Sequence, residues 1–150
     1  KRRWVSAPRS PRVRGVELTL PEMLEWARVF GGSLEAPAVI ALRGDLGAGK
    51  TTLVQAMLSA LGVRDDVTSP TYALVHEYHS PRGPVHHCDW YRLRDAAQLA
   101  QLGWDDILRQ GGIVFVEWPE RALTALPSTT TTLHLEHVPK KPELRRLTWP

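Results

Sequence analysis

The chain of 150 residues contains no asparagine and a single cysteine, Cys88. An Asn-Lys-x-Asp motif for guanine therefore cannot be present, and a GTPase of that type is excluded. One cysteine excludes an internal disulfide framework and suits a reducing cytoplasm. The apolar runs are short, and none approaches the ~20 residues that a helix needs to cross a bilayer. We therefore expect a cytoplasmic protein that does not enter a membrane.

The charge of the chain is modestly positive, with a formal net charge of +3. The first fifteen residues combine arginine with proline and serine and lack the apolar stretch of a secretory signal, so we expect residues 1–15 to form a disordered basic tail. Residues 16–150 are then expected to form one domain. For the basic excess we favour a solvated surface over a nucleic-acid footprint.

The nonapeptide GDLGAGKTT at residues 44–52 contains the phosphate-binding pattern G-x-x-x-x-G-K-[ST]. Glycines let the backbone curl, so that successive N–H groups point at phosphate oxygens. In this pattern Lys50 neutralises the β- and γ-phosphates, and the Thr51 hydroxyl is a Mg²⁺ ligand. The residues expected to bind the nucleotide are Gly44, Asp45, Leu46, Gly47, Ala48, Gly49, Lys50, Thr51 and Thr52.

Both flanks of this loop fit the same chemistry. The apolar run at 38–42 predicts a buried strand, and residues 52–61 predict a helix closed by Gly62. A strand, a glycine loop and a helix in this order bring the orphan N–H donors of the helix N-terminus to the phosphates. The alternative is a chance match in a glycine-rich surface turn, and the flanking elements argue against it.

Hydrophobic period and turn residues predict the other elements. Residues 16–34 predict a strand and then a helix that has Leu24, Ala27 and Phe30 on one face and ends at Gly31 and Gly32. The remaining elements are a hairpin of two extended runs at 67–79 and 85–93, a helical stretch at 94–112 interrupted at Gly103, a strand at 113–117, a short helix at 119–126, and strands at 130–137 and 143–149.

The strand IVFVE at 113–117 ends in an acid, Glu117. A buried strand of this kind brings its carboxyl end beside a phosphate loop, and Mg²⁺ in such sites takes one or two carboxylates with several waters. Glu117 is therefore the candidate for the second magnesium anchor, directly or through a water. The structural alternative is an ordinary strand-end glutamate on the surface.

The segment HCDWYR contains Asp89, a residue type depleted in strands, so we expect its carboxylate to have a partner. The candidates are a magnesium-bound water, Lys50 and a backbone turn. Strand period places His87, Asp89 and Tyr91 on one face and the residues between them on the other. A zinc site at His86, His87 and Cys88 is disfavoured, because adjacent histidines point to opposite faces and no C-x₂-C spacing accompanies them.

Thr68, Ser69 and Thr71 lie around a proline in a hydroxyl-rich segment. Such a loop after the first strand–helix unit can close over the γ-phosphate, as switch loops do. An ordinary turn, in which these hydroxyls bind their own backbone, is an equally good interpretation of the composition. The six tryptophans are expected mostly in core or interface packing.

With these residues assembled, the chain resembles the TsaE (YjeE) family of small bacterial ATPases. The matching segments, in order, are GDLGAGKTT at 44–52, LG at 61–62, SPTYALVHEY at 69–78, HCDWYRL at 87–93, LGWDDIL at 102–108 and VEWPER at 116–121. The chain departs from the family at Cys88 and Trp90, where other apolar residues are usual. Both are expected on the face away from Asp89, so no loss of activity is expected.

The resemblance implies an α/β, single-domain, three-layer fold like that of P-loop NTPases, with a mixed sheet flanked by helices. It implies that ATP and Mg²⁺ bind, with Thr51 and Glu117 on the metal, and that Thr71 and Asp89 lie in switch-like elements near the γ-phosphate. Lys50, Thr71, Asp89 and Glu117 are the expected catalytic set. The adenine pocket is expected around residues 19–23, with Thr19 as a nucleotide-binding residue.

The resemblance also implies partners and a process. ATP hydrolysis would support the threonylcarbamoyl (t6A) modification of adenosine 37 in tRNA by resetting the TsaB–TsaD complex, which performs the transfer. Contact with tRNA would be indirect, through that complex, and hydrolysis would be slow without it. The sequence does not give the oligomeric state, and a monomer is the working expectation for the isolated chain.

Two other functions stay open at this point. A nucleotide-sensing binding module would need the same Lys50, Thr51 and Glu117, so the sequence separates it poorly from an ATPase. A small-molecule kinase is less favoured, because it would need an acceptor pocket and an arginine-bearing lid, and residues 103–112 contain only Arg109.

Overall fold

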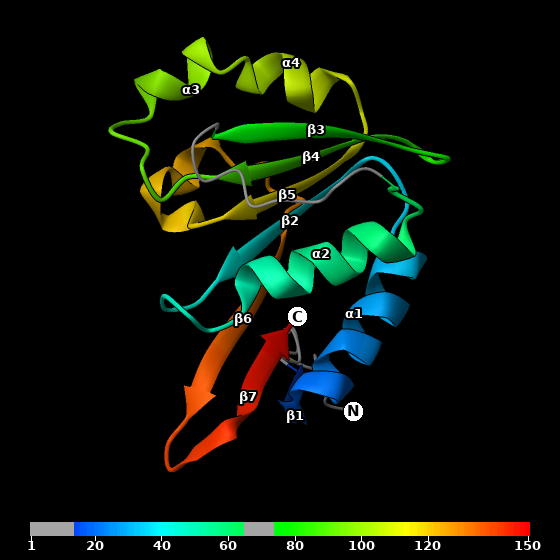
Figure 1. Ribbon diagram of the computed structural model, residues 1–150. Helices are drawn as coiled ribbons and strands as arrows, with labels where there is room; N and C mark the ends of the chain where they lie inside the picture. Colours follow the sequence, from blue (N-terminus) through cyan, green and yellow to red (C-terminus); the bar gives the residue numbers. More distant parts are fainter. Residues whose placement is uncertain (1–13, 65–73) are drawn as a thin grey trace, which may run out of the picture.

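The computed structural model describes residues 14–64 and 74–150, whose strands form one seven-stranded sheet (Figure 1). The strands are β1 (Arg14–Thr19), β2 (Ala38–Arg43), β3 (Val75–Ser80), β4 (Gly83–Asp89), β5 (Ile113–Glu117), β6 (Thr131–Val138) and β7 (Lys141–Trp149). Their order is β1-β7-β6-β2-β5-β4-β3. The three central pairings, β6 with β2, β2 with β5 and β5 with β4, are parallel, and the outer pairings are antiparallel.

Helices cover both faces of this sheet (Figure 1). They are α1 (Leu20–Ser33), α2 (Lys50–Ala60), α3 (Ala97–Gln101) and α4 (Trp104–Arg109), with 3₁₀ turns η1 (Pro119–Arg121) and η2 (Leu123–Ala125). Alternate residues of β5 join different cores. Phe115 packs with residues of α1 and α2, whereas Val114 packs with residues of α3 and α4. The expected three-layer α/β fold with a mixed sheet is therefore confirmed.

None of the helices in the described ranges has the length and apolar content needed to cross a membrane. The strand β1 begins at Arg14, so the last two residues of the stretch expected as a tail lie in the sheet. Residues 1–13 are outside the described part of the chain.

Helix α1 differs from the sequence prediction in its buried face and in its end. Its buried residues are Met23, Ala27 and Gly31, whereas Leu24 is 38% exposed, so the prediction for Leu24 was wrong. The helix also continues past Gly31 to Ser33. A Cβ on Gly31 would lie 2.8 Å from the Met57 Cα of α2. This glycine therefore serves the close contact between two helices and does not end α1.

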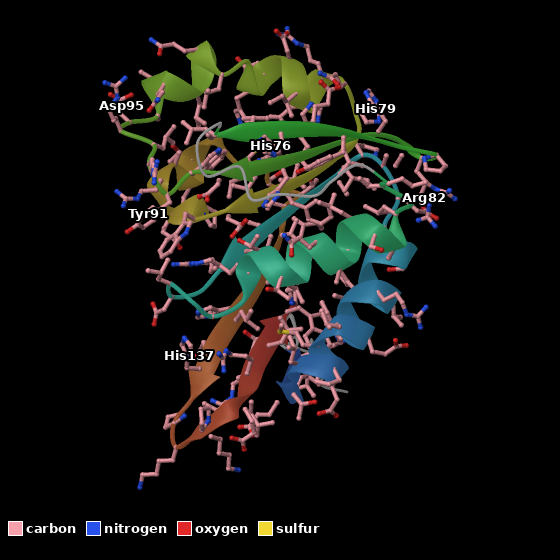
Figure 2. All side chains as sticks on the ribbon, viewed as in Figure 1. His76, His79, Arg82, Tyr91, Asp95 and His137 are labelled. Atoms are coloured by element: carbon pink, nitrogen blue, oxygen red, sulfur yellow. The ribbon has the colours of Figure 1, made fainter. Side chains whose placement is uncertain are left out.

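The turn between β3 and β4 supports the carboxyl end of α1. Arg82 lies at this turn (Figure 2), and its Nη1 donates hydrogen bonds to the carbonyls of Gly32 (2.6 Å) and Leu34 (3.0 Å). The last carbonyls of a helix have no partner within the helix, so an arginine here satisfies them. The predicted antiparallel hairpin of these two strands is confirmed, with His76 opposite His87.

Strand β4 ends earlier than predicted. It stops at Asp89, and Trp90–Leu93 form a turn in which the Leu93 N–H donates to the Trp90 carbonyl at 3.0 Å. The helical stretch that follows is interrupted at Gly103 as predicted, giving α3 and α4. The side chain of Asp95 accepts the Gln98 N–H at 3.0 Å, as expected of a residue near a helix start.

Candidate functional site

The glycine loop lies between the end of β2 and the start of α2, and its geometry depends on particular glycines. Gly49 precedes α2 with φ of 107° and Gly44 has φ of 151°, a backbone region that favours glycine. A Cβ on Gly44 would also collide with the Leu135 carbonyl oxygen of β6. The loop is therefore packed against the sheet, and helix α2 begins at Lys50, two residues earlier than predicted.

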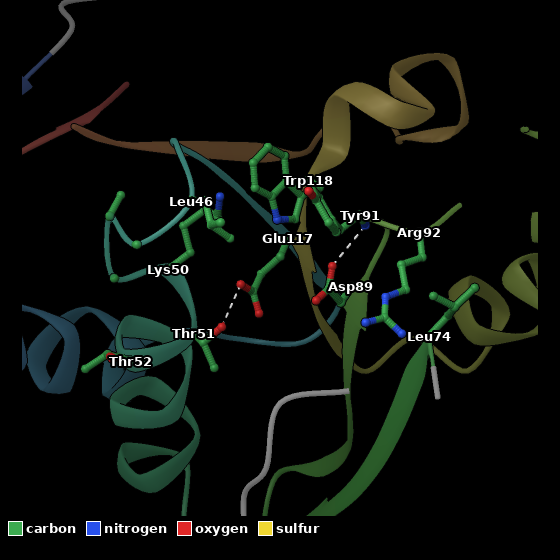
Figure 3. Close-up of a pocket in the computed structure, with 13 residues that line it drawn as sticks. Leu46, Lys50, Thr51, Thr52, Leu74, Asp89, Tyr91, Arg92, Glu117 and Trp118 are labelled. Carbon is green, nitrogen blue, oxygen red and sulfur yellow. Dashed lines mark hydrogen bonds between the residues drawn. The ribbon is translucent and has the colours of Figure 1, made fainter. Parts of the chain in front are cut away.

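A cavity of about 510 Å³ opens beside this loop, a volume suited to a small ligand (Figure 3). It is lined by residues 46–52 of the loop and by Leu74, Asp89, Tyr91, Arg92, Glu117 and Trp118. Gly44 and Asp45 are not among the residues that line this cavity, but their carbonyls accept hydrogen bonds from other residues of the loop. The Gly44 carbonyl accepts a hydrogen bond from Lys50 Nζ, and the Asp45 carbonyl accepts the Ala48 N–H at 3.0 Å.

Lys50 is buried at the base of the cavity and is only 5% exposed. Its Nζ lies 3.5 Å from the centroid of the Trp118 ring, within the range of a cation–π contact. Burial lowers the pKa of Lys50, and the nearby carboxylates, that of Glu117 foremost, oppose this shift. The lysine thus faces a polar, partly desolvated space in which an anion would be a strong partner.

Glu117 is also buried, at 2% exposure, and both of its carboxylate oxygens have partners. Thr51 Oγ1 donates to Glu117 Oε1 at 2.8 Å (Figure 3). His87 Nε2 lies 2.5 Å from Glu117 Oε2. The alternative of a strand-end glutamate on the surface is therefore wrong, because the side chain lies inside, at the carboxyl end of β5.

Asp89 is directly opposite Glu117 in the parallel pairing of β4 with β5 and lines the same cavity. Its Oδ1 accepts the Tyr91 N–H at 2.9 Å, so a backbone turn is one partner of this carboxylate. Burial raises the pKa of Asp89, and the hydrogen bond from Tyr91 opposes the shift. The second carboxylate oxygen remains directed to the side of the cavity on which Glu117 lies (Figure 3).

A second cavity of about 510 Å³ lies on the other side of the loop. It is lined by Thr19, Leu20, Pro21, Met23, Gly47, Ala48, Gly49, Thr52, Pro142, Glu143 and Arg145. Thr19 is the N-cap of α1 and accepts the Glu22 N–H in a capping box. Arg145 of β7 reaches the loop from the opposite side, where its Nε donates to the Ala48 carbonyl at 3.1 Å. The segment expected around the adenine thus borders the loop.

The fold brings together most of the side chains singled out in the sequence. Lys50, Thr51, Asp89 and Glu117 surround one cavity, and Thr19 borders the second. Thr71, like Thr68 and Ser69, lies outside the described residues. Cys88 and Trp90 were expected on the face away from Asp89, and both belong to the core on the other side of the sheet.

Sequence reasoning missed the roles of Trp118 and His87. Trp118 directly follows Glu117 and adopts a left-handed backbone with φ of 57°, and its ring lies over Lys50 Nζ. From the sequence, the tryptophans were expected mostly in core or interface packing. That expectation holds for Trp90 and Trp104, whose ring centroids are 5.1 Å apart. For His87 a signal existed, because strand period placed it on the same face as Asp89.

His86, His87 and Cys88 belong to no metal-binding group among the described residues. Within residues 14–64 and 74–150, no group of three or more His, Cys, Asp or Glu side chains gathers in an arrangement that could hold a metal ion. His86 faces Glu77 at 3.9 Å, whereas His87 faces Glu117. Burial raises the pKa of Cys88 to about 12, so this thiol is not a nucleophile near neutral pH.

Several known proteins are similar to this chain over most of its length. The family model "Threonylcarbamoyl adenosine biosynthesis protein TsaE" matches residues 19–147. Proteins named tRNA threonylcarbamoyladenosine biosynthesis protein TsaE from Treponema pallidum and Haemophilus influenzae are 34% and 38% identical, over 82% and 77% of this chain and 90% and 76% of theirs.

A relative of the same name from Nostoc sp. is 43% identical over 67% of this chain and 64% of its own length. Among solved structures, the crystal structure of Bacillus subtilis YdiB superposes with a TM-score of 0.70 at 25% identity, covering 93% of this chain and 87% of that one. The match to the family model and the identities over most of the chain lead to one conclusion: the chain belongs to the TsaE family.

Proposed function

We propose that this chain is a magnesium-dependent ATPase that supports the t6A modification of tRNA. The observation that carries the proposal is the contact between the Thr51 hydroxyl and the buried Glu117 carboxylate, 2.8 Å apart at the mouth of a glycine loop. A hydroxyl and a carboxylate are oxygen ligands of the kind that Mg²⁺ prefers, so Thr51 and Glu117 would hold the metal in the cavity that Lys50 also lines.

The two cavities suggest how a nucleotide is held. The phosphates would lie in the cavity of Lys50, Thr51 and Glu117, while the base and ribose would occupy the cavity bordered by Thr19 and Arg145. Gly47, Ala48, Gly49 and Thr52 line both spaces, so one ligand can extend across the loop. Adenine is the favoured base, because a chain without asparagine has no Asn-Lys-x-Asp guanine motif.

In this mechanism Lys50 exchanges the Gly44 carbonyl and the Trp118 ring for phosphate oxygens. Mg²⁺, when bound, supplies charge that stabilises the developing negative charge on the transferred phosphoryl group. Thr51 and Glu117 would hold it. Asp89, across the cavity, would orient a water for attack on the γ-phosphorus; the bond from this phosphorus to the bridging oxygen breaks, and ADP, phosphate and a proton are released.

The biological role is proposed from the names of the relatives, which are those of t6A biosynthesis proteins. The partner in this proposal is the TsaB–TsaD complex, which transfers the threonylcarbamoyl group to adenosine 37. Hydrolysis by this chain would reset that complex between turnovers, and tRNA would be contacted through it. A cytoplasmic location and a monomeric isolated chain belong to the same proposal.

Reconstitution tests the proposal. Formation of t6A on tRNA is followed in a reaction that contains TsaB, TsaD and the activated threonylcarbamoyl donor. The reaction is run with and without this chain, and ATP consumption is measured in parallel. We expect hydrolysis to be slow for the isolated chain and severalfold faster with the complex, and we expect repeated t6A turnover to require it. If the complex changes neither hydrolysis nor t6A yield, the proposed role is wrong.

A nucleotide-sensing module is the alternative from a different functional class. It predicts that a non-hydrolysable ATP analogue supports as much t6A formation as ATP does. This comparison is made in a reaction in which no other component uses ATP. A small-molecule kinase gains no support from Arg109, which pairs with Asp106 on the surface and does not line either cavity.

A further inference from the structure

The contact between His87 and Glu117 has no part in the reaction described above, although it joins two buried side chains. His87 is fully buried and Glu117 is 2% exposed. Their atoms Nε2 and Oε2 are 2.5 Å apart. A buried carboxylate is costly unless its oxygens accept hydrogen bonds, so a pair at this distance has a large influence on where the carboxylate points.

We propose that His87 is a positioning residue for the magnesium anchor: its imidazole Nε2–H holds one oxygen of Glu117, so that the other oxygen faces Thr51 and the metal. This inference deepens the proposed function and rests on it. The two oxygens of Glu117 then have separate tasks. Oε2 is fixed from β4, while Oε1 meets the Thr51 hydroxyl of α2 at 2.8 Å.

The direction of the hydrogen bond follows from the donor inventory. A carboxylate has no proton to give, so the imidazole nitrogen at 2.5 Å is the donor. The other ring nitrogen, Nδ1, is buried without a hydrogen-bond partner in the described part of the chain. One N–H of the imidazole directed at Oε2 leaves Oε1, the other oxygen of Glu117, for Thr51 and the metal.

The fold explains why His87 can reach Glu117. In the parallel pairing of β4 with β5, His87 is opposite Phe115, and Asp89 is opposite Glu117. His87 and Asp89 lie on the same face of β4, two residues apart, and this face looks toward α2. The histidine therefore approaches the carboxylate from the core side, whereas Asp89 lines the cavity.

Two substitutions of the same chemistry separate positioning from packing. In His87→Gln, the amide nitrogen reaches the place of Nε2 and can donate to Glu117. In His87→Asn, the amide is one methylene shorter and falls short of it. Cys88→Ala is the matched control, because Cys88 is equally buried on the next position of β4 but belongs to the opposite core.

The readout is metal binding rather than turnover. Mn²⁺ serves as the probe, and its affinity for the complex of the full chain with ADP is measured from the electron paramagnetic resonance signal of free Mn²⁺. Affinity for ADP in the presence of EDTA reports whether the loop itself is intact. We expect His87→Asn to weaken Mn²⁺ binding by about 10- to 100-fold, with ADP binding in EDTA unchanged. His87→Gln should retain most of the affinity.

Thermal unfolding and a double substitution complete the test. Cys88→Ala should lower the melting temperature but keep the Mn²⁺ affinity of the parent. In a Glu117→Gln background, His87→Asn should cause no further loss, because the oxygen it positions is no longer part of a carboxylate. Equal affinity of the Asn and Gln variants, or an equal loss in Cys88→Ala, would overturn the inference. If the parent chain with ADP binds no Mn²⁺ at all, the proposed metal-dependent function fails, and this inference fails with it.

Discussion

The ammonium group of Lys50 lies 3.5 Å from the centroid of the Trp118 ring and donates a hydrogen bond to the Gly44 carbonyl. Both partners belong to the site itself, one in the loop and one directly after Glu117. A buried lysine is thus stabilised by groups that a phosphate would replace in the proposed function. The relationship explains how the cavity keeps a desolvated cation that forms no ion pair with a carboxylate of the described residues.

The first prediction concerns this lysine. Lys50→Ala should weaken ATP binding by about 10- to 100-fold, because a charge-assisted contact with phosphate is lost. Isothermal titration calorimetry measures it. Lys141→Ala is the control, since Lys141 is exposed at the start of β7 and lines neither cavity. Unaltered ATP affinity in Lys50→Ala would contradict the assignment of the phosphate site.

Glu117→Gln should separate binding from chemistry. The amide keeps the size of the side chain and an oxygen for Thr51, so ATP affinity should change less than about tenfold. Hydrolysis should fall by about 100-fold or more, because charge on the metal ligand matters most in the transition state. Single-turnover rates are compared with Glu120→Gln, whose parent carboxylate pairs with Arg43 and lines neither of the two cavities described. A wild-type rate in Glu117→Gln would remove this residue from the metal site.

Asp89→Asn tests the orientation of the attacking water. The amide oxygen can still accept the Tyr91 N–H, so the turn should survive. Burial raises the pKa of Asp89, which means that the charged form is disfavoured there, and the neutral amide should leave the melting temperature equal or higher. Hydrolysis should fall by about 100-fold. Normal multiple-turnover rates would return Asp89 to a purely structural role.

Two adjacent glycines of α1 provide a test of the fold. Gly31→Ala should destabilise the protein by about 1–3 kcal/mol, because its Cβ would press on the Met57 backbone of α2. Gly32→Ala should be neutral or stabilise it by up to ~1 kcal/mol. Among the described residues, no atom outside the backbone of α1 itself and the neighbouring residues lies within 4 Å of the added carbon, and alanine favours helix. Urea unfolding measures both changes. Equal effects at the two positions would mean that α1 and α2 do not approach as closely as described.

The stability of the protein should depend on pH through His86. Burial lowers the pKa of His86, and Glu77 only partly opposes this shift. Below about pH 6.5 the unfolded chain therefore binds a proton that the folded chain resists, and the free energy of unfolding falls as the pH falls. One such proton gives a slope of at most ~1.4 kcal/mol per pH unit. Urea unfolding at about pH 5 and pH 7.5 should show a smaller difference for His86→Met than for the parent chain.

Local patterns were sufficient to predict the phosphate loop, its flanking strand and helix, and the buried strand that ends at Glu117. Each depends on neighbours in the sequence. The buried face of α1 was not predictable in the same way, because apolar residues at both 23 and 24 fit a helical stripe and only contact with α2 decides between them. The end of β4 depends on the hydrogen bond of Asp89 to Tyr91, and the partner of His87 depends on the pairing with β5.

The pairing of β1 with β7 has a consequence for the order in which this protein folds. Arg14 is opposite Trp149 and Thr19 is opposite Leu144, so this pairing joins opposite ends of the described chain. Contacts between residues so distant in sequence close late and slow the folding of a domain. The second cavity, bordered by Thr19 and Arg145, can therefore assemble only after β7 has been synthesised. In the proposed function, a nucleotide spanning both cavities would select chains in which β7 has folded over nascent chains that still lack this strand.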